Sequence, residues 1–214
     1  MEQVLDFSCE GESMEQIPAS VIEAAGISYI EAHTLKDAMA AAAVGIKELN
    51  RDCLCKIPFC VTIEADALGA KVMVAEEKTG PRLEGYRFTR IEELADIPGI
   101  NPDKGRIREV LECVHSLSQN GNVVVLNVEG PFTILGLLID SMAVYKGLKN
   151  NRDLIASILQ SIEDSVVKYI LAGIDRGAKI ISYADPTGAL EMIGPKLYSE
   201  LSGRISYNVL KKIE

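Results

Sequence analysis

Residues 123–131, which read VVVLNVEGP, decide the fold of this chain. The run 123–128 is apolar apart from Asn127, and an unbroken apolar run of this length is typical of a strand buried on both faces of a parallel sheet. The run stops at Glu129, where a Gly-Pro pair marks a turn. We therefore predict a central strand over 123–128.

Three other short apolar runs are predicted to be strands, because each ends in polar or turn-forming residues. They cover residues 4–7, 54–59 and 179–183. Residues 72–74 are predicted to be an edge segment, and 86–101 a turn-rich stretch with one short helix. Apolar residues at helical spacing occupy the segments between the strands. The predicted helices cover 18–25, 34–49, 106–118, 133–147, 153–172 and 195–213.

Two of these helices carry more specific expectations. Thr34 is the predicted N-cap of helix 34–49, with Asp37 three residues later in a variant of the capping box. Helix 195–213 is expected to turn one stripe of apolar side chains toward the core. The stripe consists of Leu197, Leu201, Ile205 and Leu210.

Strands that alternate with helices, with polar residues and Gly or Pro at the strand ends, are typical of parallel βα units. The fold class is therefore α/β, with TIM-barrel-type βα units. A closed (βα)8 barrel typically takes about 250 residues, with about 200 as a lower limit. Because the pattern contains only about four principal strands, we predict a single domain over residues 1–214 that forms a half or incomplete (βα)8 barrel.

The composition is that of an ordinary globular protein, with 48% apolar and 25% charged residues. It excludes a chain that is disordered throughout. The 22 Lys and Arg residues against 31 Asp and Glu give a net charge of −9, which disfavours binding to nucleic acid or to an anionic membrane. Charged residues interrupt every apolar stretch before the ~18 residues that a membrane span needs, so none is expected.

The five cysteines and the start of the chain bear on location and metal binding. The sequence opens Met1-Glu2-Gln3 without the basic region of a signal peptide, and we expect a cytoplasmic protein with reduced thiols. Cys53, Cys55 and Cys60 lack a second Cys or His pair at zinc-ligand spacing, so no metal site is expected.

Common catalytic motifs are absent from the sequence. It has no Gly-rich phosphate loop of the usual spacings, no G-x-S-x-G nucleophile elbow and no H-E-x-x-H pair. Kinase, dinucleotide-dependent oxidoreductase, serine hydrolase and zinc protease activities therefore lose their main support.

In βα architectures, ligands bind at the carboxyl ends of the strands, because loops converge there and helix N-termini point inward. That rule selects four places, which are residues 8–10, 60–64, 127–131 and 182–187. Three residues within them, Glu64, Asn127 and Asp185, have a structural alternative that the sequence leaves open. Glu64 is also consistent with a solvated or capping carboxylate, Asn127 with a hydrogen bond to a neighbouring strand, and Asp185 with a cap on the helix that follows it.

Several segments, in the same order along the chain, carry a resemblance to a known family. They read EAHT at 31–34, IPFCVTIEADALGA at 57–70, EGPFT at 129–133, SYADPTG at 182–188 and IGPK at 193–196. Together they resemble the uroporphyrinogen decarboxylase superfamily. The specific likeness is to its corrinoid methyltransferase branch, the methylcobamide:coenzyme M methyltransferases and their relatives, over roughly the first four βα units.

The resemblance implies a barrel whose carboxyl-end rim, called the mouth below, receives a methylated corrinoid carried on a partner protein and passes the methyl group to a small thiol. The resemblance does not assign a catalytic residue in this chain. The residues expected to face the corrinoid or substrate are Glu64, Asn127, Glu129, Thr133, Asp185 and Thr187.

Zinc activates the thiol in that branch, because metal coordination favours the nucleophilic thiolate. The resemblance implies that its ligands are a His-x-Cys pair and a later Cys in the second half of the barrel. This chain has no histidine after His115 and no cysteine after Cys113. The family's zinc ligand set is therefore not expected here.

Three functions compete on this evidence. The first is corrinoid-dependent methyl transfer in methanogenesis or methylotrophy, by the chain itself or as a subunit. The second is a non-catalytic barrel half that binds a corrinoid protein or a partner chain, which the missing zinc ligands favour for the isolated chain. The third is uroporphyrinogen decarboxylation.

The decarboxylase alternative is the weakest of the three, because its polycarboxylate substrate calls for clustered arginines. The first arginine is Arg51, and Leu138 stands where the decarboxylases place a tyrosine.

An open half barrel leaves strand edges exposed. We therefore expect either pairing of two copies or a complementary barrel half.

Overall fold

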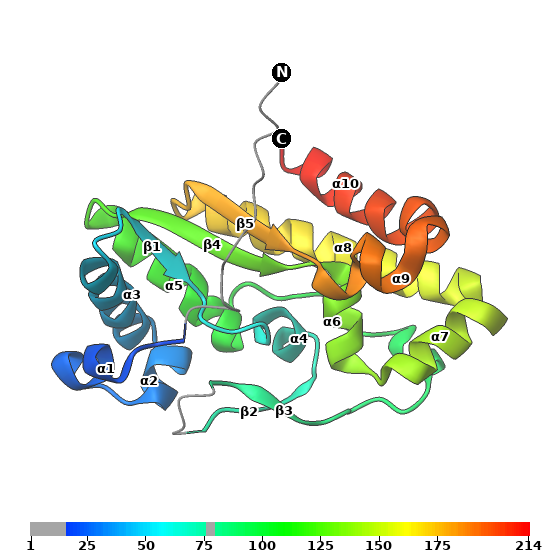
Figure 1. Ribbon diagram of the computed structural model, residues 1–214, viewed down its shortest axis with the longest axis horizontal. Coiled ribbons are helices and arrows are strands. Elements are labelled where there is room, and N and C mark those ends of the chain that lie inside the picture. The colour runs from blue at the N-terminus through cyan, green and yellow to red at the C-terminus, as the bar shows by residue number, and fades with distance from the viewer. Residues whose placement is uncertain (1–15, 76–79) are drawn as a thin grey trace, which may run out of the picture.

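The computed structural model describes residues 16–75 and 80–214. Three parallel strands form its main sheet, and they lie side by side in Figure 1. They are β1 (Leu54–Ile57), β4 (Val123–Glu129) and β5 (Ile180–Ala184). Because the order is β1-β4-β5, the run 123–128 lies in the central strand, as predicted.

A separate antiparallel pair of strands lies apart from this sheet, below α4 in Figure 1. It consists of β2 (Lys71–Met73) and β3 (Arg82–Gly85). The predicted edge segment 72–74 belongs to this hairpin and not to the parallel sheet. The predicted strand 4–7 and the strand-end residues 8–10 lie outside the described residues. Within those residues the parallel sheet therefore has three strands, and the α/β class holds.

Helices precede, connect and follow the parallel strands. They are α1 (Ala19–Ala25), α2 (Tyr29–Thr34), α3 (Lys36–Asn50), α4 (Ile63–Ala67), η1 (Ile91–Leu94), α5 (Gly105–Gln119), α6 (Pro131–Leu138), α7 (Ser141–Asn150), α8 (Arg152–Asp175), η2 (Pro186–Gly188), α9 (Leu190–Leu197), η3 (Tyr198–Ser202) and α10 (Gly203–Lys212). None of the described helices is both long and apolar enough to cross a membrane.

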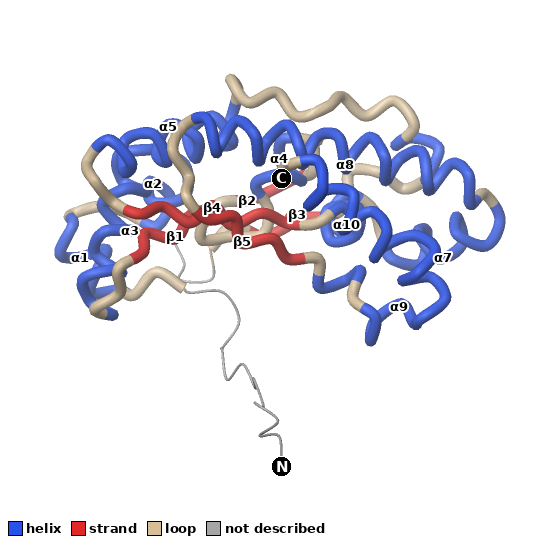
Figure 2. The backbone as a smooth tube through the Cα atoms, turned by 90° about the horizontal axis from the view of Figure 1, so that it is seen from above, coloured by secondary structure: helices blue, strands red, loops and turns tan. Residues whose placement is uncertain are grey.

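The two faces of the sheet differ in their cover. Figure 2 shows α5 and α8 running along one side of it. Alternate residues of β5, Ile180, Ser182 and Ala184, are exposed, and Ile180 keeps 43% of its surface. A closed barrel would bury a strand on both faces. The exposed β5 face is therefore consistent with an open set of βα units.

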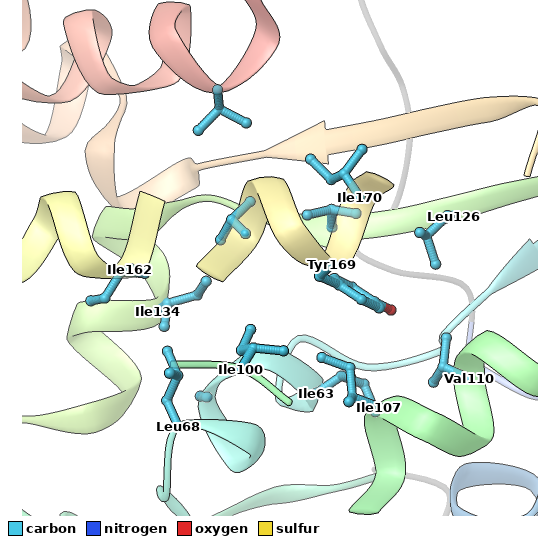
Figure 3. Close-up of a cluster of buried hydrophobic side chains, with 14 of the residues drawn as sticks. Ile63, Leu68, Ile100, Ile107, Val110, Leu126, Ile134, Ile162, Tyr169 and Ile170 are labelled. Carbon is cyan, nitrogen blue, oxygen red and sulfur yellow. The ribbon is translucent and has the colours of Figure 1, made fainter. Parts of the chain in front are cut away.

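The main core lies between the sheet and the helices that cover it. Figure 3 shows Leu126 of β4, Ile107 and Val110 of α5 and Tyr169 of α8 turned toward one another, and all four are fully or almost fully buried. At Gly173 a Cβ would overlap the side chain of Leu126. This glycine therefore lets α8 approach the central strand closely.

The predicted helix 34–49 is wrong at its start. Thr34 ends α2 instead of capping the next helix, and its hydroxyl donates to the carbonyl of Ile30. The capping box belongs to α2, where Ser28 and Glu31 exchange hydrogen bonds. Helix α3 begins after Leu35, which is extended and has no side-chain cap. The apolar spacing runs across this one-residue break, so periodicity alone does not reveal it.

The predicted helix 195–213 begins at a bend in α9, where Gly194 has a positive φ of 77°. The end of α9, the π-helical turn η3 and α10 then follow one another to Lys212. The predicted apolar stripe is wrong at Leu210. Leu210 is 49% exposed, whereas Val209 is fully buried. Leu210 lies five positions after Ile205, about 140° around a helix, so it faces away from the buried stripe.

The predicted helix 133–147 is two helices, α6 and α7, separated at Ile139 and Asp140. The Asp140 carboxylate accepts the N–H of Met142 and caps α7. This cap gives the chain a new helix start within an apolar stretch.

Replacing Leu126 by Ala tests the packing of the central strand. We expect a loss of about 2–5 kcal/mol in the free energy of unfolding, because the variant leaves a cavity between β4 and α8. Denaturant unfolding measures the loss. Val123→Ala, at the exposed start of the same strand, is the control and is expected to change stability by about 0.5 kcal/mol. Equal losses would contradict the described core.

Candidate functional site

The six residues expected at the mouth all follow or end parallel strands. Glu64 stands in the first turn of α4, after β1. Asn127 and Glu129 belong to β4, and Glu129 pairs with Ala184 at the end of β5. Asp185 follows directly. Thr133 in α6 and Thr187 in η2 lie beside it, with their hydroxyl oxygens 3.3 Å apart.

Glu64 is buried, with 1% of its surface exposed. Its Oε1 accepts the backbone N–H of Glu129 at 3.0 Å, which ties α4 to the end of the central strand. Burial is the main reason why the pKa of Glu64 is raised to about 8. The backbone hydrogen bond from Glu129 and the positive charge of Arg106 oppose this rise, whereas the negative charge of Glu129 adds to it. The solvated-carboxylate alternative is therefore wrong for Glu64.

Glu129 is half-buried at the carboxyl end of β4. Its Oε2 is shielded from solvent and has no hydrogen-bond partner among the described residues. Burial raises the pKa of Glu129 to about 7, and the negative charge of Asp185 adds to that rise. Its carboxyl group therefore changes charge near neutral pH.

Asp185 caps a helix, but not the one that follows it in the chain. Oδ1 accepts the N–H and the hydroxyl of Thr133, both at 2.8 Å, and Oδ2 accepts the N–H of Phe132 at 3.2 Å. These donors are the first turn of α6. The following η2 receives no side-chain cap from Asp185. At Gly130 a Cβ would overlap the Asp185 side chain, so glycine permits this contact.

The pKa of Asp185 is raised by burial, although the hydrogen bonds from α6 oppose that rise.

Asn127 takes the structural role that the sequence left open. Its Nδ2 donates to the carbonyl of Pro58, just beyond β1, at 3.0 Å. The amide therefore joins the ends of two neighbouring strands.

Arg106 organises the polar layer beneath the mouth, and nothing in the sequence marks this residue beyond its place at the start of the predicted helix 106–118. Its guanidinium donates to Thr62 Oγ1, Asp66 Oδ2 and Cys60 Sγ, and to the carbonyl of His33. These four bonds hold the β1–α4 connection against α5 and α2. The guanidinium is therefore engaged away from the three mouth carboxylates.

Tyr169 of α8 is a second residue that the sequence does not single out. Its side chain is fully buried, and its hydroxyl has no hydrogen-bond partner among the described residues. Burial raises its pKa well above the usual range, and Glu64 contributes the largest charge effect.

A small apolar cavity of about 200 Å³ opens beside the mouth. Phe132, Leu137 and Val144 line it together with the hydroxyl-bearing Thr133 and Thr187. The lining has no charged side chain. It suits a small uncharged group.

The described residues do not fit the zinc that the resemblance implies. Cys55, Cys60 and Cys113 are buried free thiols, and Cys53 is an exposed one. No three His, Cys, Asp or Glu side chains in residues 16–75 and 80–214 come together as a metal site. No step is therefore derived through a metal ion.

Comparison with protein families gives one match that covers almost the whole chain. The family profile described as uroporphyrinogen decarboxylase (URO-D) matches residues 9–214. A uroporphyrinogen decarboxylase of Verminephrobacter eiseniae is 32% identical over 134 residues, which are 58% of this chain and 35% of that protein.

Two methyltransferases are similar over more of the chain. The methylcobamide:CoM methyltransferase MtbA of Methanosarcina mazei is 28% identical over 183 residues, 84% of this chain and 53% of that protein. MtaA of Methanosarcina barkeri strain Fusaro is 23% identical over 203 residues, 89% of this chain and 60% of that protein. The chain thus spans between half and two thirds of the length of these relatives.

A solved methyltransferase from Methanosarcina mazei has a similar structure. The TM-score is 0.81 at 21% sequence identity, over 95% of this chain and 64% of that one. This likeness supports the α/β fold with a parallel sheet.

Asp185→Asn tests the cap on α6. We expect a loss of about 1–2 kcal/mol in the free energy of unfolding, because an amide NH₂ then faces the N–H of Phe132 or Thr133. Chemical denaturation measures it. Asp140→Asn at the start of α7 is the matched control, and it should lose less because one exposed hydrogen bond is involved. An unchanged Asp185→Asn stability would rule out the cap.

Glu64→Gln tests the buried carboxyl group. The folded pKa of about 8 lies above the unfolded value of about 4.3, so the folded state binds more protons between these values. The stability of the native protein therefore falls as the pH rises through this window and levels off above it. In Glu64→Gln the amide oxygen can still accept the N–H of Glu129 but carries no charge, so the stability of this variant should fall less over the same pH range. Denaturant unfolding at a series of pH values measures the free energy of unfolding of the native protein and of the variant. An identical decrease in the two proteins would contradict the pKa assigned to Glu64.

Proposed function

This chain belongs to the uroporphyrinogen decarboxylase family, and from that premise we propose that it takes part in methyl transfer from a methylated corrinoid protein to a small thiol. It acts either alone or as one part of a larger enzyme. The methylcobamide:CoM methyltransferase relatives support this choice within the family, because they are similar over 84% and 89% of the chain.

The observation that carries the proposal is the charge of the mouth. Glu64, Glu129 and Asp185 gather there, and Glu64 and Asp185 accept hydrogen bonds from backbone N–H groups and from the Thr133 hydroxyl. Uroporphyrinogen bears many carboxylates, which a rim of carboxyl groups repels when these are ionised and does not attract when they are protonated. The peripheral side chains of a corrinoid are largely neutral amides, which such a rim accepts.

The polar groups of the mouth suit binding and orientation of a neutral macrocycle. Thr187 is exposed beside Thr133, and both line the uncharged cavity next to the rim. Hydroxyl groups donate to and accept from amides equally well. We assign these two residues to contacts with the edge of the corrinoid.

A second candidate is a non-catalytic barrel half that binds a corrinoid protein or a partner chain. The lack of a metal-binding group among the described residues favours it. The exposed face of β5 suits cover by a complementary barrel half or a second copy of the chain. We place this assembly in the cytoplasm.

Anaerobic incubation with methylcobalamin and coenzyme M separates these functions. The methyltransferase predicts loss of the methyl-cobalt absorbance and formation of the methyl thioether, with zinc content measured in the same preparation. The binding module predicts retained affinity for a corrinoid protein without turnover. Release of carbon dioxide from uroporphyrinogen, with neither corrinoid binding nor thioether, would contradict the proposal.

A further inference from the structure

The apolar cavity of about 200 Å³ beside the mouth is formed by α6, α7, α9 and η2. Figure 1 shows these helices at the end of the molecule to which β4 and β5 point. Its lining includes Thr133, whose hydroxyl donates to Asp185 at the mouth. A site for a whole drug-sized ligand typically has about 300–1,000 Å³. The cavity therefore suits one side group of a larger molecule that lies at the mouth.

Gly136 keeps this cavity open. It stands inside α6 and lines the cavity. A Cβ at this position would meet no described side chain or other element within 4 Å. Glycine inside a helix is less stable than alanine, and here no close approach of another element requires it. Open space at such a glycine points to a group that enters from outside.

Hydroxyl groups at the cavity have unused hydrogen-bonding capacity. Thr187 donates to Thr133 Oγ1 at 3.3 Å, and its own oxygen accepts no hydrogen bond from the described residues. The hydroxyls of Ser141 and Tyr145 make no hydrogen bond within residues 16–75 and 80–214. These two residues are four positions apart on α7 and so share one face of that helix.

On the footing of the proposed function, we propose that the cavity is a subsite for one neutral amide side chain of the corrinoid. An amide carries both a donor and an acceptor. The oxygen of Thr187 accepts the amide N–H, and the hydroxyls of Ser141 and Tyr145 donate to the amide carbonyl. The apolar walls surround the methylene carbons that join the amide to the ring.

Neither a carboxylate nor an alkyl group satisfies this lining. No charged side chain lines the cavity, and Asp185 lies within 2.8 Å of the Thr133 hydroxyl. A carboxylate would lose its water there without gaining a cation. An alkyl group would cover the hydroxyls without giving them a partner. The cavity therefore selects a corrinoid with amide side chains over one with free carboxylic acids.

Equilibrium dialysis of the 214-residue chain at pH 7, read out by the absorbance of the corrin ring, tests this selection. The two probes are cobyric acid, in which all side chains but one are amides, and cobyrinic acid, in which they are carboxylic acids. Both lack the nucleotide tail of cobalamin. The native protein should bind cobyric acid about tenfold or more tightly than cobyrinic acid, as expected for one or two added hydrogen bonds.

Two variants locate the selection at the cavity. Gly136→Leu fills the cavity, and the space around a Cβ there allows the variant to fold. It should lower the affinity for cobyric acid by about tenfold or more and remove the preference over cobyrinic acid. Thr187→Val replaces one hydroxyl by a methyl group and should lower the affinity for cobyric acid by about 2- to 10-fold.

Ala41→Leu places the same side chain in a different apolar groove, between α1 and α3, and is the matched control for Gly136→Leu. It should keep both native affinities. Denaturant unfolding of each variant verifies that it is folded. If Gly136→Leu does not fold, Thr187→Val decides.

Equal affinity of the native protein for the two corrinoids overturns the subsite. An unchanged preference in folded Gly136→Leu, or a native affinity for cobyric acid in Thr187→Val, overturns it as well. In these three cases the proposed function stands, because a corrinoid still binds. Failure of the native protein to bind either corrinoid overturns the proposed function together with the inference.

Discussion

The hydrogen bond from the backbone N–H of Glu129 to the buried carboxyl group of Glu64 is the interaction on which the rest of the mouth depends. It fixes α4 against the end of the central strand and places a carboxyl group where water does not reach it. Burial without a strong counter-charge favours the protonated form. The same geometry therefore sets both the shape and the charge of the site.

The fold could be predicted from the sequence where burial dominates local structure. The run 123–128 is the central strand because an apolar run has no alternative to burial on both faces. Prediction failed where one residue changes direction. Leu35 separates α2 from α3 without interrupting the apolar spacing, although the S-x-x-E pattern of Ser28 and Glu31 marks the start of α2. The phase of α10 likewise decides that Val209, four positions after Ile205, is buried and Leu210 is not.

The candidate site could be placed, but its internal contacts could not. The strand-end rule brings Glu64, Glu129 and Asp185 to one rim because parallel strands share a direction. The partner of Asp185 is the start of α6, more than fifty residues earlier in the chain, and no local pattern indicates that pairing. The bonds of Arg106 to Thr62 and Cys60 are equally long-range. Such contacts depend on how helices pack and not on spacing in the sequence.

A site-resolved titration of the glutamate side-chain carboxyl carbons by NMR measures the protonation of the two buried glutamates. Glu64 and Glu129 are expected to titrate near 8 and 7, and Glu129→Gln is expected to lower the pKa of Glu64, because it removes a neighbouring negative charge. Titration of both groups near the ordinary glutamate value of about 4.3 would contradict this expectation.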